Sequence, residues 1–224
     1  MVVLLIFIFL AQTPAELLSR GMERFQAGQV EESVKDFDLL IEADPSSEPY
    51  LWQRGIALYY LGRFKDCKAQ FERHRVVNAD DVENAAWHYL CTARADSPAK
   101  ARRQLIPIAY DPRPPMMTVH AMLAGKAAPD DVLRDAGKDD TARFFAYLYV
   151  GLYWEADGNA VKAEPWLKRA AEASTGQDYM GAVARVHWAR LGRSTMPKPQ
   201  VRMVDAPGEM LPAGRVRRIS QNAP

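Results

Sequence analysis

The residues that could carry chemistry are few, and their spacing matches no catalytic or metal-binding motif. No histidine lies four residues from another, as the ligands of a zinc-binding helix would; the four are His74, His88, His120 and His187. The sequence also lacks a glycine-rich phosphate loop and a Gly-x-Ser-x-Gly turn. We therefore predict a protein that is not an enzyme, with no catalytic residues, no cofactor and no metal ligands.

Two acidic pairs, Asp130-Asp131 and Asp139-Asp140, are the remaining candidates for a carboxylate site. Each pair comes directly before a stretch that we expect to be helical. Carboxylates at that position stabilise the positive end of the helix dipole. We therefore interpret both pairs as structural.

The balance of charges argues against the broad basic surface of a nucleic-acid-binding protein. The chain of 224 residues has 29 Lys and Arg against 28 Asp and Glu, a formal net charge of +1. Arg215, Arg217 and Arg218 could touch an anionic surface, although a solvated tail is the simpler interpretation. With 48% hydrophobic residues, the chain can bury one core, which we expect to belong to a single elongated domain.

A pattern repeated at a spacing of 34 residues organises the first part of the chain. The matching pairs are Arg20 and Arg54, Gly21 and Gly55, Gly28 and Gly62, and Phe37 and Phe71. A glycine inside a helix costs ~1 kcal/mol relative to alanine. Gly21 and Gly55 lie mid-helix by the surrounding periodicity, so a close approach of the neighbouring helix is expected there. The pattern therefore predicts pairs of helices that pack tightly.

A helix–turn–helix repeat of this length resembles the tetratricopeptide-repeat family. The resemblance covers about residues 14–192 and implies an all-α fold, a superhelical solenoid of antiparallel helix pairs. Three early units, an irregular middle segment and a late unit with a capping helix resemble the tetratricopeptide lipoproteins of the bacterial envelope, which bring together a periplasmic protease and peptidoglycan hydrolases. The family binds other proteins, so the resemblance implies a non-catalytic adaptor.

The sequence divides into three parts. Residues 1–13 are predicted to be a signal peptide or a short hydrophobic segment, residues 14–192 the repeat domain, and residues 193–224 a disordered, proline-rich and basic tail. The expected units are 14–47, 48–81, a degenerate 82–115, an irregular 116–143, 144–177 and a capping helix at 178–192. Helices are expected at 14–27, 30–43, 48–61 and 64–77, with short ones at 116–123 and 130–136.

Residues 1–10 form an apolar run that predicts export. The run is too short to span a bilayer, which takes ~20 residues, but it has the length of the apolar part of a signal peptide. No Lys or Arg precedes it, and no cysteine follows it that could be lipidated. We predict a periplasmic or envelope location. Two alternatives stay open, a misassigned start codon and a short membrane-associated segment. If the N-terminal segment is not cleaved, it is the one part of the chain that we expect to contact a membrane.

The two cysteines, Cys67 and Cys91, are too few for a disulfide framework. They fall on helices of neighbouring units, and we expect them to be small buried thiols. A disulfide stays open as the alternative, because sequence spacing cannot establish the geometry that the bond requires.

In the tetratricopeptide family, the first helix of each pair lines a concave groove. At the corresponding positions the resemblance implies seven partner-binding residues, which are Met22, Phe25, Trp52, Ile56, Tyr59, Tyr60 and Leu90. The family's clamp for chaperone tails needs lysine and asparagine where this chain has Leu18 and Met22, so that ligand is not expected. An apolar, aromatic groove instead suits a protein or peptide with an apolar segment.

A second interpretation is a structural or assembly subunit whose groove is permanently occupied. A surface this apolar is rarely left bare. It could be filled by the chain's own residues 111–136, or by a second copy of the chain in a homodimer. The measured mass in dilute solution separates a homodimer from an adaptor that awaits a partner.

Overall fold

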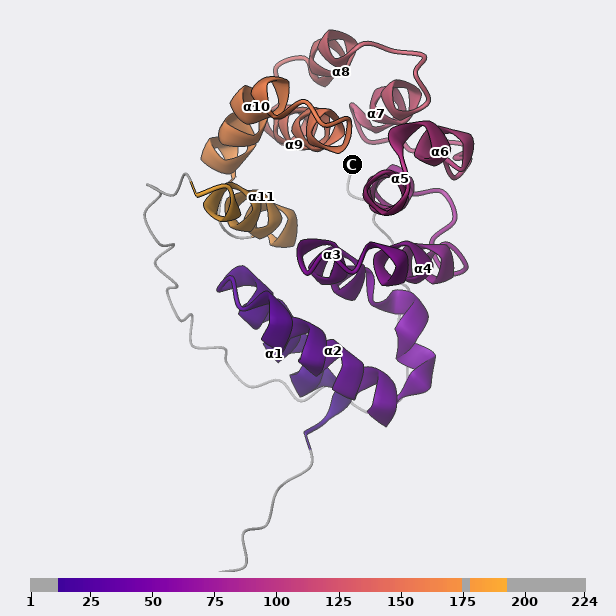
Figure 1. Cartoon of the computed structure of the whole chain (residues 1–224), viewed down its shortest axis with the longest axis vertical. Helices are drawn as coiled ribbons and strands as arrows, with labels where there is room; N and C mark the ends of the chain where they lie inside the picture. Colours follow the sequence, from indigo (N-terminus) through magenta and orange to yellow (C-terminus); the bar gives the residue numbers. More distant parts are fainter. Residues whose placement is uncertain (1–11, 175–177, 193–224) are drawn as a thin grey trace, which may run out of the picture.

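The computed structural model describes residues 12–174 and 178–192, and every regular element in these ranges is a helix. The predicted all-α class is confirmed. The elements in chain order are α1 (Pro14–Gln26), α2 (Val30–Ala43), the 3₁₀ helix η1 (Pro45–Tyr50), α3 (Trp52–Tyr60), α4 (Phe64–His74), α5 (Val82–Ala95), α6 (Pro98–Arg103), α7 (Met116–Leu123), α8 (Pro129–Ala136), α9 (Asp140–Ala156), α10 (Ala160–Ala173) and α11 (Tyr179–Arg190) (Figure 1). The predicted cleavable segment, apart from its last two residues, and the predicted tail at 193–224 lie outside the described residues.

Capping residues set the starts of several helices. Thr13 accepts a hydrogen bond from the Glu16 backbone N–H at 3.3 Å, and the Glu16 carboxylate accepts one from the Thr13 backbone N–H at 2.8 Å. The two acidic pairs have the same role. Asp131 accepts from the Ala128 backbone N–H at 2.9 Å and Asp139 from the Ala142 backbone N–H at 2.8 Å. These bonds agree with the structural interpretation of both pairs.

The helices pack as neighbouring pairs, α1 with α2, α3 with α4, and α9 with α10. In each pair a glycine allows close contact. A Cβ atom added to Gly21 would lie 2.6 Å from the Phe37 ring, and one added to Gly55 would lie 2.7 Å from the Phe71 ring. At Gly151 the same atom would lie 2.7 Å from the Leu167 side chain. The predicted close approach at Gly21 and Gly55 is therefore confirmed.

Several helices are shorter than the sequence predicts. The helix expected at 48–61 begins at Trp52, because Pro45–Tyr50 forms a 3₁₀ turn capped by the Asp44 side chain, which accepts from the Ser46 backbone N–H at 3.1 Å. The helix expected at 64–77 ends at His74. The degenerate third unit keeps a second helix of one and a half turns, α6, and the chain then runs without regular structure to α7. Within that stretch Pro107 lacks the backbone donor that a longer helix would need.

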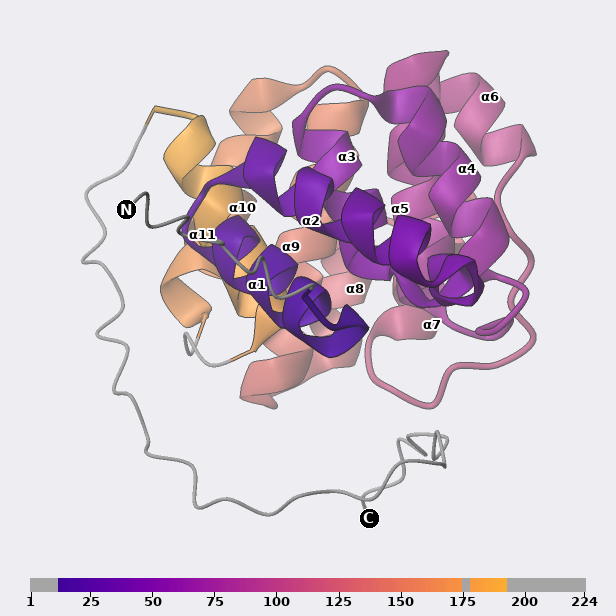
Figure 2. The same ribbon diagram turned by 90° about the horizontal axis from the view of Figure 1, so that it is seen from below.

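The two ends of the described chain meet. Helix α11 packs against α10 and also against α1, so the helices surround a common centre (Figures 1 and 2). Helices α7 and α8, from the irregular middle segment, pack against each other and against α9, and α7 also contacts α5. A helix that is apolar all round is buried on more than one side. That holds for α11, whose buried residues include Tyr179, Val183, Val186 and Trp188.

One prediction about the cysteines is wrong. The structure joins Cys67 of α4 to Cys91 of α5 in a disulfide, with Cα atoms 5.9 Å apart, where buried thiols were expected. Both residues are buried, as expected. The bond is feasible because α4 and α5 pack side by side, an arrangement that the spacing of 24 residues along the chain does not reveal.

Among the described residues, none of the helices combines the length and the apolar character needed to cross a membrane.

Candidate functional site

The seven residues predicted to bind a partner lie largely in the core. Met22 and Trp52 are half-buried, and the other five, which are Phe25, Ile56, Tyr59, Tyr60 and Leu90, are buried. Each buried side chain packs within the one continuous apolar cluster of the described chain. Their role in binding stays a prediction. Trp52 lines one cavity, and Tyr59 and Tyr60 line a smaller one beside α11.

Helix α11 covers the predicted groove in its first two units. The Tyr179 ring stacks on Phe25 with centroids 5.2 Å apart and meets the edge of Trp52 at 5.2 Å. The hydroxyl of Tyr60 lies 3.0 Å from His187 Nδ1, and Arg190 donates to the Tyr60 carbonyl at 2.8 Å. The sequence nominated residues 111–136 for this position. Residues 116–136 pack against α5 and α9, so the contacts over Phe25, Trp52 and Tyr60 come from α11, whereas α7 lies against α5, the helix of Leu90.

A half-buried carboxylate links α11 to α3 and α9. Glu155 of α9 lies 3.4 Å from His187 Nε2, and the Tyr59 hydroxyl lies 3.5 Å from the same carboxylate. Burial alone would raise the pKa of Glu155, but the interactions with His187, Arg94 and Tyr59 together outweigh burial and lower the pKa below its usual value. The cluster therefore stabilises the packing of α11 and does not leave a free acid.

A cavity of about 580 Å³ lies between the helices, within the ~300–1,000 Å³ typical of ligand sites. Residues of α3, α4, α5, α9 and α11 line it. We call it the central cavity. Its aromatic lining comes from Trp52, Phe71, Trp87, Phe144, Phe145 and Tyr179.

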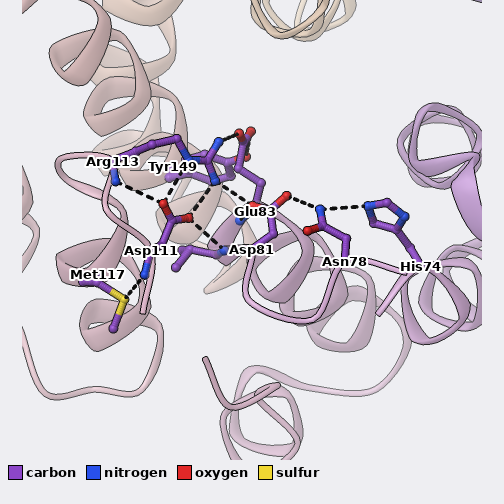
Figure 3. Close-up of polar contacts among 9 residues, drawn as sticks. His74, Asn78, Asp81, Glu83, Asp111, Arg113, Met117 and Tyr149 are labelled. Atoms are coloured by element: carbon purple, nitrogen blue, oxygen red, sulfur yellow. Dashed lines mark hydrogen bonds and ion pairs between the residues drawn. The ribbon is translucent and has the colours of Figure 1, made fainter. Parts of the chain in front are cut away.

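Polar residues form another part of the wall, organised by Arg113. Its guanidinium donates to Asp81 at 2.7 Å, to Glu83 at 2.8 Å and to Asp111 at 2.6 and 2.9 Å. The hydroxyl of Tyr149 donates to the other oxygen of Glu83 at 2.7 Å. Figure 3 shows Arg113 between these carboxylates, which come from the start of α5 and from the loop before α7. Asp81, Glu83 and Arg113 line the cavity, whereas Asp111 is buried and holds Arg113 in place. We call these four residues the acidic wall.

A line of hydrogen bonds continues from the acidic wall to α4 (Figure 3). The Asn78 amide donates to Asp81 at 2.7 Å, and its nitrogen lies 3.3 Å from His74 Nε2. The other ring nitrogen, Nδ1, lies 2.8 Å from the carbonyl of Pro49, so Nδ1 carries the proton and Nε2 accepts. His74 thus connects α4 to the carbonyl of Pro49 and to Asn78.

The acidic wall holds more negative than positive charge, and the pKa values reflect this. Burial and the charge of Asp81 raise the pKa of Glu83 to about 7, although Arg113 and Tyr149 act in the opposite direction. At Asp111, burial opposes ionisation, but the hydrogen bonds and charge of Arg113 outweigh it and lower the pKa. The guanidinium of Arg113 therefore outweighs the effect of burial on the pKa of Asp111, but it does not do so for Glu83.

Four buried polar atoms on residues that line the central cavity have no hydrogen-bond partner among the described residues. They are both amide atoms of Asn84, the indole Nε1 of Trp87 and the hydroxyl of Tyr179. Unpartnered buried polar groups are rare, because each costs ~1–3 kcal/mol. Asn84 is 2% exposed, so its amide has little access to bulk water. These four atoms are themselves closed off from solvent, so the side chains line the cavity through their other atoms.

No group of three or more His, Cys, Asp and Glu side chains suited to a metal ion occurs within residues 12–174 and 178–192.

Sequence reasoning found Trp52 but missed the rest of this site. Asp81 shows a signal, because an aspartate before an apolar helical stretch predicts an N-cap, and it does cap α5 through the Glu83 backbone N–H at 2.9 Å. Arg113 shows none, because it sits in a proline-rich segment 32 residues from Asp81. Its role depends on how that segment folds back on α5.

The sequence matches no protein-family model, and no curated protein is similar to it at a significant level.

Proposed function

We propose that this chain is a non-catalytic, tetratricopeptide-like solenoid that binds a protein or peptide partner in the central cavity, and that it works outside the cytoplasm in the bacterial cell envelope. The observation that carries the proposal is the cavity of about 580 Å³, which six aromatic side chains line. Trp52, one of the six, is half-buried. Buried aromatic residues are the usual anchors of binding energy at protein interfaces.

Equivalent contacts in successive units support the tetratricopeptide-like architecture. Gly21 meets Phe37 and Gly55 meets Phe71, and each pair is separated by 16 residues. The arginine before each glycine also bonds 16 residues ahead, Arg20 to Asp36 at 2.9 Å and Arg54 to Gln70 at 3.0 Å. Such agreement across units is expected of a repeat in which each unit buries its face against the next.

The disulfide supports the location. Disulfides form and persist in oxidising compartments such as the bacterial periplasm and are rare in the cytoplasm. The buried bond between Cys67 and Cys91 therefore agrees with the export that the apolar run at residues 1–10 predicts.

A second function is favoured by a different observation. Helix α11 already occupies the predicted groove over Phe25, Trp52 and Tyr60, as expected of a structural or assembly subunit that fills its own groove. Under that function the chain needs no partner in the central cavity. Self-association is a variant of it, and a stable dimer mass in dilute solution would favour it.

Replacing Trp52 distinguishes the two functions. Peptides are first selected from a random library on the full chain, and their affinities are then measured for Trp52→Ala and for Trp166→Ala. Trp166 is a matched control, because it is also half-buried and packs against Tyr147, away from the cavity. We expect Trp52→Ala to weaken binding at least tenfold, since truncating an aromatic anchor costs ~2 kcal/mol or more.

The stability of the same variants completes the test. Trp52 is half-buried, so Trp52→Ala should keep the melting temperature within a few degrees of the parent. If Trp52→Ala unfolds the chain, Trp52 belongs to the core and the self-filled subunit is the better account. Selected peptides that bind both variants equally well would contradict binding in the cavity.

A further inference from the structure

We propose that the central cavity binds the cationic side chain of a lysine or arginine, carried on an apolar segment of the partner, with the cation against the acidic wall and the alkyl stem among the aromatic rings. The inference rests on the proposed function and adds the chemistry of the ligand. It follows from the charge balance of the wall and from the arrangement of the aromatic residues.

The charge balance leaves room for a second cation. Asp81, Glu83 and Asp111 share one guanidinium, and all three carboxylates lie within 2.9 Å of its nitrogens. The side chain of Glu83 is 17% exposed and that of Asp81 is 21% exposed, so the excess negative charge is only partly screened by water. Asp140, at the start of α9, adds an exposed carboxylate to the lining. A positively charged group is the ligand that this wall lacks.

The aromatic lining suits the rest of such a side chain. A cation near the face of a tryptophan is stabilised by the ring quadrupole, and the effect is larger at desolvated sites. Lysine and arginine place three or four methylene groups behind the charge, which can pack along apolar surface. Trp52, Phe71 and Trp87 provide that surface next to the acidic wall. The chain already uses this interaction elsewhere, with the Lys162 ammonium 4.2 Å from the Trp154 ring centroid.

A pair of small probes tests the charge requirement on the intact chain. Butylguanidinium and butylurea have almost the same shape, but only the first is charged. Each is titrated at pH 8 into the full chain while the indole N–H signals of the tryptophans are followed by NMR. We expect saturable shifts of the Trp52 and Trp87 signals with butylguanidinium, and at least tenfold weaker binding of butylurea. Equal binding of the two probes, or no binding of either, would overturn the inference.

A matched pair of variants tests the location. Glu83→Gln removes one charge from the acidic wall and keeps the shape, so it should weaken butylguanidinium at least fivefold. Glu31→Gln removes one charge from the exposed outer face of α2 and should leave the affinity unchanged within twofold. Equal affinities in the two variants would overturn the assignment to the acidic wall. If Glu83→Gln does not fold, the comparison of the two probes on the parent chain still tests whether the cavity requires a positive charge.

Two further comparisons identify the source of the cation. The capped peptide Ala-Leu-Arg-Leu-Ala should bind at least tenfold more tightly than butylguanidinium if a partner segment is the ligand, and equal affinities would favour a free small cation instead. Deleting residues 193–224, which include Arg215, Arg217 and Arg218, should leave the peptide affinity unchanged. A clear rise on deletion would assign the cavity to the chain's own basic segment and overturn the partner assignment.

These results are separable from those of the proposed function. Library peptides that bind in a Trp52-dependent way but carry no Lys or Arg would keep the proposed function and reject the cationic ligand. Failure of both the library selection and the probes would reject the two together.

Discussion

Arg113 joins two parts of the chain that the sequence separates by about thirty residues. Its guanidinium donates to Asp81 and Glu83 at the start of α5 and to Asp111 two residues before it. Asp111 in turn accepts from the Val82 backbone N–H at 3.2 Å. The proline-rich segment at 111–115 is thereby fixed against the first turn of α5. Removing the guanidinium would leave three acids close together with no cation, an arrangement of like charges that destabilises a fold.

The raised pKa of Glu83 predicts an unusual pH dependence of stability. The folded pKa is about 7, whereas an exposed glutamate has a pKa of ~4.5, so the folded state holds the proton more tightly. Stability from this group is therefore complete below pH ~4.5 and is lost as the pH rises to 7. The integrated loss is of the order of 3 kcal/mol. Urea unfolding at pH 5 and pH 8 should show this loss in the parent chain.

Glu83→Gln provides the reference for this measurement. The variant keeps a neutral group at all pH values, while Asp81, Asp111, Arg113 and Tyr149 still surround the position. The variant should match the parent at pH 5 and be more stable than it at pH 8. Parallel pH profiles for the two proteins would contradict the raised pKa.

The contact between Gly55 and Phe71 predicts a second effect at the scale of a residue. Phe71 is buried and stacks on Trp87 with centroids 6.4 Å apart, so its ring cannot move aside for a larger side chain. Gly55→Leu should lower the free energy of unfolding by about 3 kcal/mol, near the upper end for overpacking. Chemical denaturation measures the loss.

Gly192→Leu is the control for that substitution. A Cβ atom added to Gly192 would meet no atom of the described chain within 4 Å, and the φ of +69° adds a cost of about 1 kcal/mol. Equal losses of stability at the two positions would contradict the close packing of Gly55 against the Phe71 ring.

At the scale of an element, α11 decides how the predicted groove is used. The sequence predicts a capping helix, and the capping contact with α10 is present. The same helix also packs against α1 and brings Tyr179 onto Phe25 and Trp52. What was predicted as an open apolar face is thereby divided into a covered part under α11 and an open part, the central cavity.

The hydrogen bond between Tyr60 and His187 tests the packing of α11. Tyr60→Phe keeps the ring but removes the hydroxyl that lies 3.0 Å from His187 Nδ1 in the core. We expect a loss of about 1–2 kcal/mol, because one buried partner is left unsatisfied. Hydrogen exchange should speed up at the amides of α11 more than at those of α6, which has no described contact with α11.

A matched Tyr→Phe substitution controls for the loss of a hydroxyl. The hydroxyl of Tyr147 accepts from Arg143 at 2.6 Å at a half-buried position, where water can replace it. Tyr147→Phe should cost less than about 0.5 kcal/mol. If Tyr60→Phe costs no more than this control, the closure of α11 onto α3 does not depend on the bond.

At the scale of the whole molecule, the disulfide and the apolar N-terminal run make one joint prediction. If residues 1–10 direct export, the chain should reach an oxidising compartment and carry the bond between Cys67 and Cys91. A variant lacking residues 2–10 should stay in the cytoplasm with both thiols reduced. Both cysteines are buried, so the cells are quenched with acid and the thiols alkylated in denaturant; mass measurement then reports the two states.

The control for this measurement is Cys67→Ser in the full chain, which should show one alkylated thiol in either compartment. The same oxidation state in the parent and in the truncated chain would contradict export by residues 1–10. A phosphatase that is active only outside the cytoplasm, fused after Gly192, gives an independent readout of location.

Local interactions account for what the sequence determined on its own. Helix starts follow from cap residues such as Thr13, Ser97 and Asp139, each of which bonds to a backbone N–H three residues ahead. The tight pairs follow from Gly21 and Gly55, because a mid-helix glycine indicates a close neighbour. Both kinds of signal depend on residues within about one helix pair, so the period of 34 residues is enough to predict them.

The tertiary structure alone decided which surfaces meet. Periodicity shows that a helix has an apolar face but does not say which element covers that face. Thus Tyr60 pairs with His187 across 127 residues, Cys67 bonds to Cys91, and Arg113 reaches Asp81 through a segment without regular structure. These contacts depend on how helices distant in the sequence pack together, as α11 does against α1. The central cavity depends on such packing, so no single stretch of the sequence could indicate it.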